Sequence, residues 1–200
     1  MIRTVIFDIG NVLAGFAWKE YFLSFGYPDD IFRRLAKATV ESSVWQEHDR
    51  GRLSDEELIE LFIKNDPGIE KEIRETLDCI SGMLTRYDYA IPWIQELKGK
   101  GYQVLVLSNF AGKAYRDCQD ALDFLDYVDG GILSFQDKVV KPDPEIYKLL
   151  LDRYHLNPEE CVFLDDTEKN LPTAARFGIH TIHFQNREQA VKELDKLLAM

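Results

Sequence analysis

The segment Val5–Leu13 constrains the fold of this chain more than any other. It begins with β-branched and aromatic residues, reaches a carboxylate at Asp8, and continues into a Gly-Asn pair. Such an apolar run is typical of a strand buried in a parallel sheet, and open α/β sheets bind their ligands where the strands end. A buried carboxylate without a partner is costly. We therefore expect Asp8 to lie in a functional site, balanced by a metal, a cation or backbone donors.

Composition and charge narrow the class of protein. The chain has 200 residues, 46% of them hydrophobic, which suits one large domain or a core with a smaller insertion. Its net charge of -11 would repel both a nucleic-acid backbone and an anionic membrane, so neither is an expected partner. No stretch resembles a membrane span or a signal region, which favours a cytoplasmic location. Three widely separated cysteines predict neither a disulfide framework nor a zinc site, and the oligomeric state is left open.

Residues 14–90 differ in pattern from the rest of the chain. Their apolar positions recur at helical spacing, and no strand signal is visible between Leu13 and about Gln103. Ser54 followed three residues later by Glu57 is the signature of a capping box at a helix start. We predict a helical insertion over residues 14–90.

From residue 91 onward the sequence alternates between strand-like and helical segments. The expected strands are 103–107, 132–133, 161–164 and 181–184, with a helix over 144–154 and another through Ala174 that Gly178 ends. This alternation implies a doubly wound parallel sheet. We predict an α/β core built from residues 1–13 and 91–200.

Four polar clusters follow strand or turn signals. Because all strands of a parallel sheet end at one edge, these groups are expected to converge although they are far apart in sequence. The clusters are Asp8 with Gly10 and Asn11, then Ser108-Asn109, Lys141, and Asp165-Asp166. They supply a nucleophile, hydroxyl and amide donors, a cation, and paired carboxylates.

Electrostatics indicates how such a set could act on a phosphate ester. A carboxylate about 4 Å from a phosphate dianion is opposed by roughly 8 kcal/mol at an effective dielectric near 20, so Asp8 could not attack alone. A divalent cation held by Asp8 and the Asp165-Asp166 pair, together with Lys141, would offset that repulsion. Phosphoryl transfer to Asp8, followed by hydrolysis of the aspartyl phosphate, is the predicted reaction.

The four clusters together resemble the motifs of the haloacid dehalogenase-like superfamily. The matching segments are 7–13, Leu107-Ser108-Asn109, 141–147, and 163–170 followed by Ala174-Ala175 and Gly178-Ile179. The resemblance implies a Rossmann-like core with an inserted helical cap. Trp45, Gly51 and Ser54 are spaced as in the branch that includes sugar-phosphate phosphatases such as glucose-1-phosphate phosphatase.

By this resemblance, each cluster has an expected role. Asp8 is the nucleophile, and Mg²⁺ is held by Asp8, the Gly10 carbonyl, Asp165 and Asp166. Lys141 and Ser108 bind the phosphoryl group, to which Asn109 and the main chain at Gly10 and Asn11 also donate hydrogen bonds. The resemblance departs at Gly10, where phosphatases of the superfamily usually carry a second Asp as general acid and base. Such assistance is worth roughly 10²- to 10⁴-fold in rate, so the group that replaces it is an open question.

Each of these residues also has a structural alternative. Ser108, Asn109 and the Asp165-Asp166 pair could cap helices, and Lys141 could be a solvated loop charge. We expect Asp143 to cap the helix that starts at Pro144, and Asp166 to lead Asp165 as a metal ligand. His48, near Trp45, could contact the substrate, although a packed or solvated histidine is commoner.

Three functions follow from the sequence. The leading hypothesis is a Mg²⁺-dependent phosphatase acting on a small phosphorylated metabolite, with a sugar phosphate as the favoured class. The alternatives are a phosphate-binding or regulatory module with negligible turnover, and a dehalogenase of 2-haloacids, which would need no metal.

Overall fold

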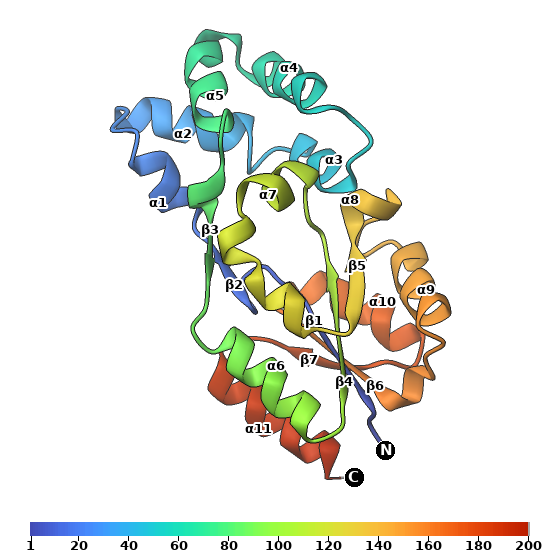
Figure 1. Cartoon of the computed structure of the whole chain (residues 1–200). Coiled ribbons are helices and arrows are strands. Elements are labelled where there is room, and N and C mark those ends of the chain that lie inside the picture. The colour runs from blue at the N-terminus through green and yellow to red at the C-terminus, as the bar shows by residue number, and fades with distance from the viewer. Residues whose placement is uncertain (200) are drawn as a thin grey trace.

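The computed structural model of the chain describes residues 1–199 and contains a parallel sheet of five strands. The strand order is β5-β4-β1-β6-β7, and every neighbouring pair is parallel. Their bounds are Thr4–Phe7 (β1), Gln103–Ser108 (β4), Gly130–Leu133 (β5), Cys161–Asp165 (β6) and His180–His183 (β7). Strand β1 is therefore central, with β4 and β6 beside it (Figure 1). The predicted doubly wound parallel sheet is confirmed.

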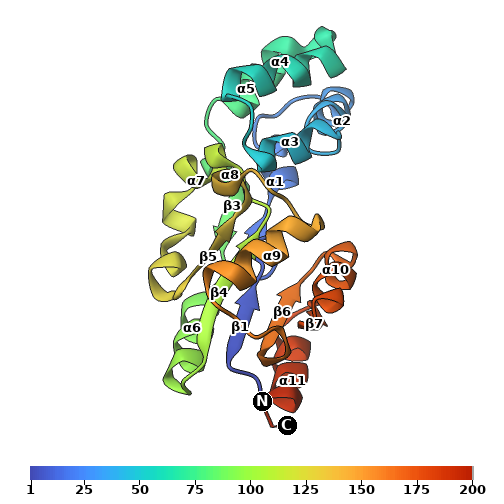
Figure 2. The ribbon, with the colours of Figure 1, turned by 90° about the vertical axis from the view of Figure 1, so that its right-hand side faces the viewer.

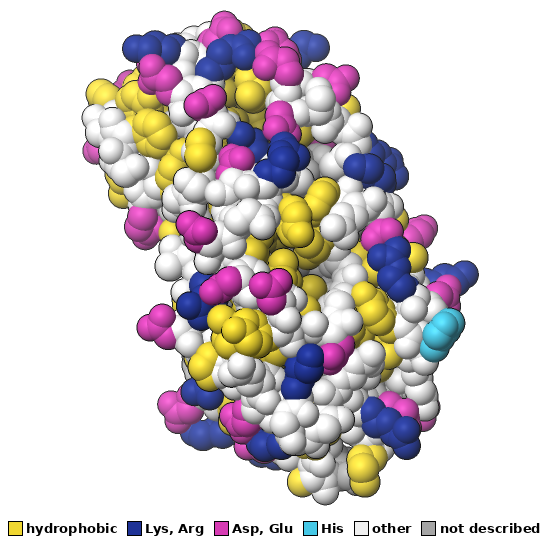
Figure 3. Space-filling view, in the orientation of Figure 1, with side chains coloured by type: hydrophobic (Ala, Val, Ile, Leu, Met, Phe, Trp, Pro, Cys, Tyr) yellow, Lys and Arg dark blue, Asp and Glu magenta, His cyan; other side chains and the backbone are white. Residues whose placement is uncertain are grey.

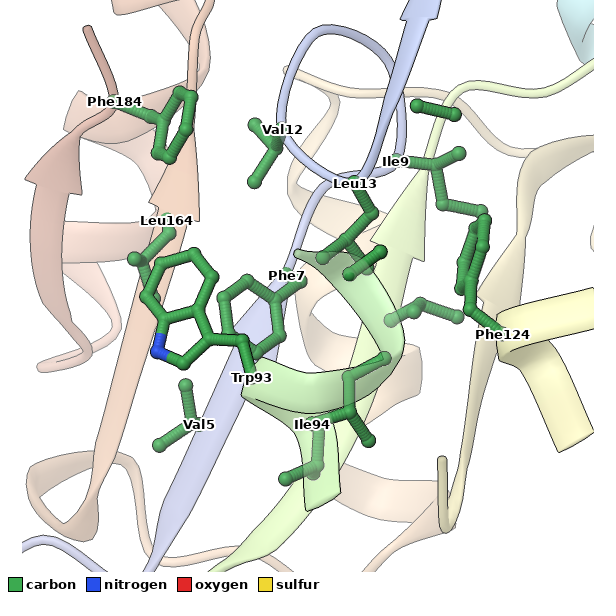
Figure 4. Close-up of a cluster of buried hydrophobic side chains, with 14 of the residues drawn as sticks. Val5, Phe7, Ile9, Val12, Leu13, Trp93, Ile94, Phe124, Leu164 and Phe184 are labelled. Carbon is green, nitrogen blue, oxygen red and sulfur yellow. The ribbon is translucent and has the colours of Figure 1, made fainter. Parts of the chain in front are cut away.

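Helices cover both faces of this sheet because alternate strand residues point to opposite sides. Val5 and Phe7 pack on one side with α6 (Ala90–Gly99) and α11 (Arg187–Leu198), and Phe7 meets Trp93 edge-on at 4.8 Å (Figure 4). Ile6 packs on the other side with α9 (Pro144–Arg153) and α10 (Leu171–Arg176). The two apolar clusters fix the position of β1, and hence of Asp8 directly after it.

Residues 14–90, which we call the cap, hold five complete α-helices and their own apolar cluster. The helices are α1 (Trp18–Leu23), α2 (Asp29–Ala38), α3 (Val44–Arg50), α4 (Asp55–Asn65) and α5 (Glu70–Leu77). They lie beyond the carboxyl ends of the core strands (Figures 1 and 2). The capping box at the start of α4 is confirmed, since Ser54 and Glu57 exchange bonds of 3.2 and 2.8 Å. The boundaries of the cap stay a prediction.

The expectation of no strand between Leu13 and Gln103 is wrong. Strands β2 (Ala14–Phe16) and β3 (Leu84–Arg86) pair antiparallel where the chain enters and leaves the cap. Each strand has three residues, too few to show an alternating pattern, and the pairing partner lies some seventy residues away. No helix within residues 1–199 is long and apolar enough to span a bilayer.

The two remaining α-helices follow core strands. They are α7 (Gly112–Asp117) after β4 and α8 (Ser134–Asp137) after β5. Both lie next to the cap, and α8 packs against α3. This packing joins the cap to the core at the carboxyl edge of the sheet.

Candidate active site

The four predicted clusters converge at the carboxyl edge of the sheet. Asp8 follows β1, Ser108 ends β4, and Asp165 ends β6, so three adjacent strands deliver their side chains to one place. Asp8, Gly10, Asn11, Ser108, Asn109, Lys141 and Asp166 all line one cavity of about 250 Å³. Asp165 does not line the cavity; it is fully buried and pairs with Lys141, which does.

Lys141 lies between the carboxylates of Asp8 and Asp165 and pairs with both. Its Nζ lies 3.0 Å from Asp8 Oδ1 and 2.6 Å from Asp165 Oδ2, and its side chain is 1% exposed. Burial alone would lower the pKa of Lys141, but the two carboxylates outweigh burial and raise it. Lys141 is therefore a fixed buried ammonium ion, which excludes the alternative of a solvated loop charge.

The Lys141 ammonium compensates the negative charge of Asp8 only in part. Burial raises its pKa to about 7, the Lys141 ammonium opposes that rise, and the charge of Asp165 adds to it. The carboxylate form of Asp8, which a nucleophile requires, therefore gains from any further positive charge bound beside it.

Asp8, Asp165 and Asp166 each offer a carboxylate oxygen within 4.8 Å of the others. Hard cations such as Mg²⁺ bind oxygen ligands of this kind. A further buried oxygen, Asn170 Oδ1, has no hydrogen-bond partner among residues 1–199, so the site retains unused acceptor capacity. Both observations fit a divalent cation. Asp166 faces the cavity, whereas Asp165 already accepts from Lys141, Asn170 and the Thr167 amide.

Two predicted residues turn out to be engaged with the protein itself. The Asn109 side chain holds the Lys141 main chain, accepting from its amide at 2.7 Å and donating to its carbonyl at 3.0 Å. Asn11, in the left-handed conformation at φ 55°, donates to Asp166 Oδ2 at 2.9 Å. Asn109 therefore positions Lys141, and Asn11 ties the loop after Asp8 to the acidic pair. Neither Ser108 nor Asn109 caps a helix, because α7 begins only at Gly112.

Asp143 differs from the sequence expectation. It occupies the N-cap position of α9, but its side chain makes no capping hydrogen bond. Instead, Asp143 Oδ2 lies 3.2 Å from Arg50 of cap helix α3. The expected capping role is wrong because a cation from the cap competes for the carboxylate.

The cap supplies side chains that sequence reasoning assigned weakly or missed. His48 is buried, lines the cavity and meets Trp45 edge-on at 5.0 Å, and burial lowers its pKa to about 4. Asp49, one residue later, also lines the cavity and was not predicted. An acid in a helix rich in charged residues gives no signal of its own, since its neighbours Glu47 and Arg50 look equally solvated in the sequence.

Comparison with known proteins places the chain in a family. The family profile of the haloacid dehalogenase-like hydrolases matches residues 2–178. The chain belongs to this family. As a member of the haloacid dehalogenase-like hydrolases it is a hydrolase, and the resemblance drawn from its four motifs is confirmed.

Two curated relatives of this hydrolase differ in length and in name. It is 27% identical over 208 residues to the D-ribitol-5-phosphate phosphatase of Bacteroides thetaiotaomicron, covering 99% of each chain. It is 31% identical to mouse acyl-CoA dehydrogenase family member 10 over 98% of its own length, but spans only 19% of that protein.

Solved structures show the same fold. The family enzyme bt-2542 from B. thetaiotaomicron, in complex with magnesium and inorganic phosphate, aligns with a TM-score of 0.70 at 23% identity, over 91% of this chain and 93% of that one. The L-2-haloacid dehalogenase of Xanthobacter autotrophicus aligns with a TM-score of 0.67 at 21% identity, over 98% and 83%. These likenesses show the fold, so the choice between phosphatase and dehalogenase chemistry depends on the site.

Proposed function

We propose that this hydrolase is a Mg²⁺-dependent phosphatase of a small phosphorylated metabolite, acting through an aspartyl phosphate on Asp8. The observation that carries the proposal is the convergence of Asp8, Lys141, Asp165 and Asp166 on one cavity. Mg²⁺ held by Asp8, Asp165 and Asp166, with the Gly10 carbonyl assigned by resemblance, would supply positive charge to the phosphoryl oxygens. The relationship to D-ribitol-5-phosphate phosphatase supports this function.

The chain's own residues perform the remaining tasks. Lys141 holds the Asp8 carboxylate in place at 3.0 Å and offers its ammonium group to the phosphoryl oxygens. The Ser108 hydroxyl and the main chain at Gly10 and Asn11 donate further hydrogen bonds at the floor of the cavity. Asp8 attacks phosphorus in line with the leaving oxygen, and water then releases phosphate from the acyl phosphate.

The dehalogenase alternative is less well supported by the site. Displacement of a halide from a 2-haloacid needs a carboxylate nucleophile and a cation for the substrate carboxylate, but not three converging carboxylates. Release of chloride from 2-chloropropionate without Mg²⁺ would favour that alternative. Tight binding of phosphate esters without turnover would favour a binding module.

Hydrolysis of p-nitrophenyl phosphate tests the proposal. We expect phosphate release that requires Mg²⁺, stops with EDTA, and is lost in Asp8→Asn. Activity that survives either treatment would overturn the proposal. The glucose-1-phosphate phosphatase resemblance and the sugar-phosphate class stay predictions, and the lining of the cavity favours a different leaving group.

A further inference from the structure

The cavity has two chemically different parts. Its floor carries the polar residues of the catalytic motifs. The rest of its lining, which we call the upper wall, comes mainly from the cap and would surround the leaving group. It is formed mainly by apolar side chains: Phe16, Trp45, Ile80, Met83 and Leu84 of the cap, and Phe110 of the core. Hydrophobic side chains also gather at the waist of the molecule, between cap and core, on the face shown in Figure 3. We infer that this upper wall binds an apolar leaving group, so the preferred substrate is an alkyl or aryl phosphate rather than a sugar phosphate.

Hydrogen-bonding capacity separates the two substrate classes. Thr167, Lys169 and Asn170 line the cavity from the motif segment 163–170. Outside the four motif segments, the described lining offers only two side chains that pair well with hydroxyl groups, His48 and Asp49. A sugar would bring several hydroxyls, and each one buried without a partner weakens binding by about ten-fold. An apolar group loses nothing there and gains from contact with Trp45 and Phe16, whose rings lie 5.9 Å apart.

Cavity size limits the leaving group. A cavity of about 150 Å³ is enough to hold benzene, so about 250 Å³ accommodates a phosphoryl group with a single ring or a short chain. The structure therefore points to a compact apolar alcohol.

A matched pair of substrates tests this inference, which rests on the proposed phosphatase function. Cyclohexylmethyl phosphate and glucose 6-phosphate both carry a phosphorylated methylene on a six-membered ring and differ mainly in hydroxyl groups. We expect kcat/KM to be at least about ten-fold higher for the cyclohexylmethyl ester. Equal values, or a preference for the sugar, would overturn the inference. If p-nitrophenyl phosphate is not hydrolysed either, the proposed function fails instead.

Met83→Gln provides a second test within the wall. The substitution keeps the length of the side chain but adds polar atoms at a residue that is 2% exposed and lines the cavity. We expect the preference for the cyclohexylmethyl ester to shrink several-fold. Leu23→Gln, on the exposed face of α1, is the matched control and should leave the preference unchanged. An unchanged preference in Met83→Gln would contradict a role for this wall in specificity.

A second, independent observation concerns the proton that an alkoxide leaving group requires. The side chain that replaces the missing acid at Gly10 must lie opposite Asp8, because the leaving oxygen departs in line with the attack. Asp8 is at the floor, so the donor must come from the cap. Asp49 is on cap helix α3, lines the cavity, and its carboxylate has no hydrogen-bond or ion-pair partner within residues 1–199.

The other groups in the cavity are unsuited to the task. Lys141 is held by two carboxylates. Asp166 accepts from Asn11 and Thr167. Burial lowers the pKa of His48 to about 4, so near neutral pH its ring is the neutral imidazole, which is not an effective general acid. Burial has the opposite consequence for the acid Asp49, because it favours the protonated form that a general acid needs. Burial and the charge of Asp8 raise the pKa of Asp49 to about 7, although Lys141 opposes the rise.

Asp49 is also held firmly against the core. Its carbonyl accepts from Ser134 Oγ at 2.6 Å, Arg50 pairs with Asp143, and the Lys138 ammonium bonds to the Gly51 carbonyl. The end of α3 is thus tied to α8 and to the loop before α9. We propose that Asp49 is the general acid and base of the reaction.

The proton balance of the proposal is complete. As the Asp8–phosphorus bond forms and the ester P–O bond breaks, the neutral Asp49 carboxyl gives its proton to the leaving alkoxide. The resulting Asp49 carboxylate then takes a proton from water as the water oxygen attacks phosphorus. The acyl P–O bond breaks, the Asp8 carboxylate is regenerated, and Asp49 is neutral again.

Leaving-group dependence tests Asp49 without relying on stability. The inference rests on the proposed function, so p-nitrophenyl phosphate serves as the internal reference: its leaving group departs readily without a proton. We expect Asp49→Asn to lower kcat for cyclohexylmethyl phosphate by about 10²-fold or more, with a much smaller loss on p-nitrophenyl phosphate. Asp30→Asn, an exposed acid of α2, should change neither rate. Equal losses on both substrates, or no loss, would overturn the assignment.

Discussion

The Lys141 ammonium lies 3.0 Å from Asp8, and both side chains are almost completely buried. Because Lys141 also pairs with Asp165 at 2.6 Å, one cation serves two carboxylates from neighbouring strands. The stability of the fold and the charge of the nucleophile therefore depend on the same side chain.

Lys141→Met should show how far the stability of the fold and the charge of Asp8 each depend on Lys141. Breaking a buried pair by removing one partner costs about 3–5 kcal/mol, and here two carboxylates lose their cation. We expect a loss of that order in the free energy of unfolding at pH 8, and activity reduced below detection. The loss should shrink toward pH 5, because Asp8 without its cation takes up a proton. Urea unfolding at both pH values measures this, and a loss independent of pH would contradict it.

Binding of Mg²⁺ should stabilise the folded protein. A ligand at 100 times its Kd adds about 2.7 kcal/mol to the free energy of unfolding. We expect Mg²⁺ to raise the melting temperature of the wild type but to have little effect on Asp166→Asn, which removes the carboxylate that faces the cavity. Asp30→Asn should respond like the wild type. An equal response of Asp166→Asn would exclude Asp166 as a ligand.

Asp49→Asn should stabilise the protein at neutral and alkaline pH. In the unfolded chain this carboxyl loses its proton near the ordinary aspartate pKa of 3.8, whereas in the folded protein it keeps the proton until about 7. The folded state therefore binds more protons between these values, and its stability falls as pH rises through this window. Asn carries no titratable group, so the free energy of unfolding of the variant does not fall with pH for this reason. At about 1.4 kcal/mol per pKa unit, the difference between 3.8 and about 7 corresponds to about 4 kcal/mol, so we expect a gain of up to about 4 kcal/mol at pH 8 and almost none at pH 4. A gain that does not depend on pH, measured by urea unfolding, would contradict this account.

Gly51→Ala should disturb the contact between cap and core. Gly51 has φ 65°, and a Cβ there would lie 2.8 Å from Phe135 Cα. Gly26 has a similar φ of 69° but no atom within 4 Å of such a Cβ, so Gly26→Ala measures the backbone strain alone. We expect about 1–2 kcal/mol of destabilisation and normal activity in Gly26→Ala. Gly51→Ala should be less stable and lose at least about ten-fold in kcat/KM, because it displaces Asp49. Normal activity in Gly51→Ala would show that this contact does not position the site.

The sequence predicted the core of the site because its residues follow buried strands. Asp8, Ser108 and Asp165 stand at the ends of β1, β4 and β6, and the parallel sheet brings those ends together without further information. Lys141 was expected in the site as the cation that the carboxylates require, but a lysine in a loop has no distinctive local pattern, and its role in binding the phosphoryl group came from the resemblance.

The cap contribution could not be predicted in the same way. The positions of Asp49 and Arg50 depend on how α3 packs on α8, a contact between segments some eighty residues apart. The β2–β3 pairing and the Arg50–Asp143 ion pair are likewise long-range. The local sequence correctly predicted Asp143 at the N-cap position of α9. Its carboxylate pairs with Arg50 of the cap rather than with the helix, and that contact depends on tertiary packing.

Acid quenching of the enzyme during turnover tests the central claim most directly. With ³²P-labelled phosphate ester and Mg²⁺, we expect label bound covalently to the peptide that contains Asp8, released by hydroxylamine as an acyl phosphate, and absent from Asp8→Asn. Release of phosphate without covalent label on Asp8, or label on another residue, would contradict the account.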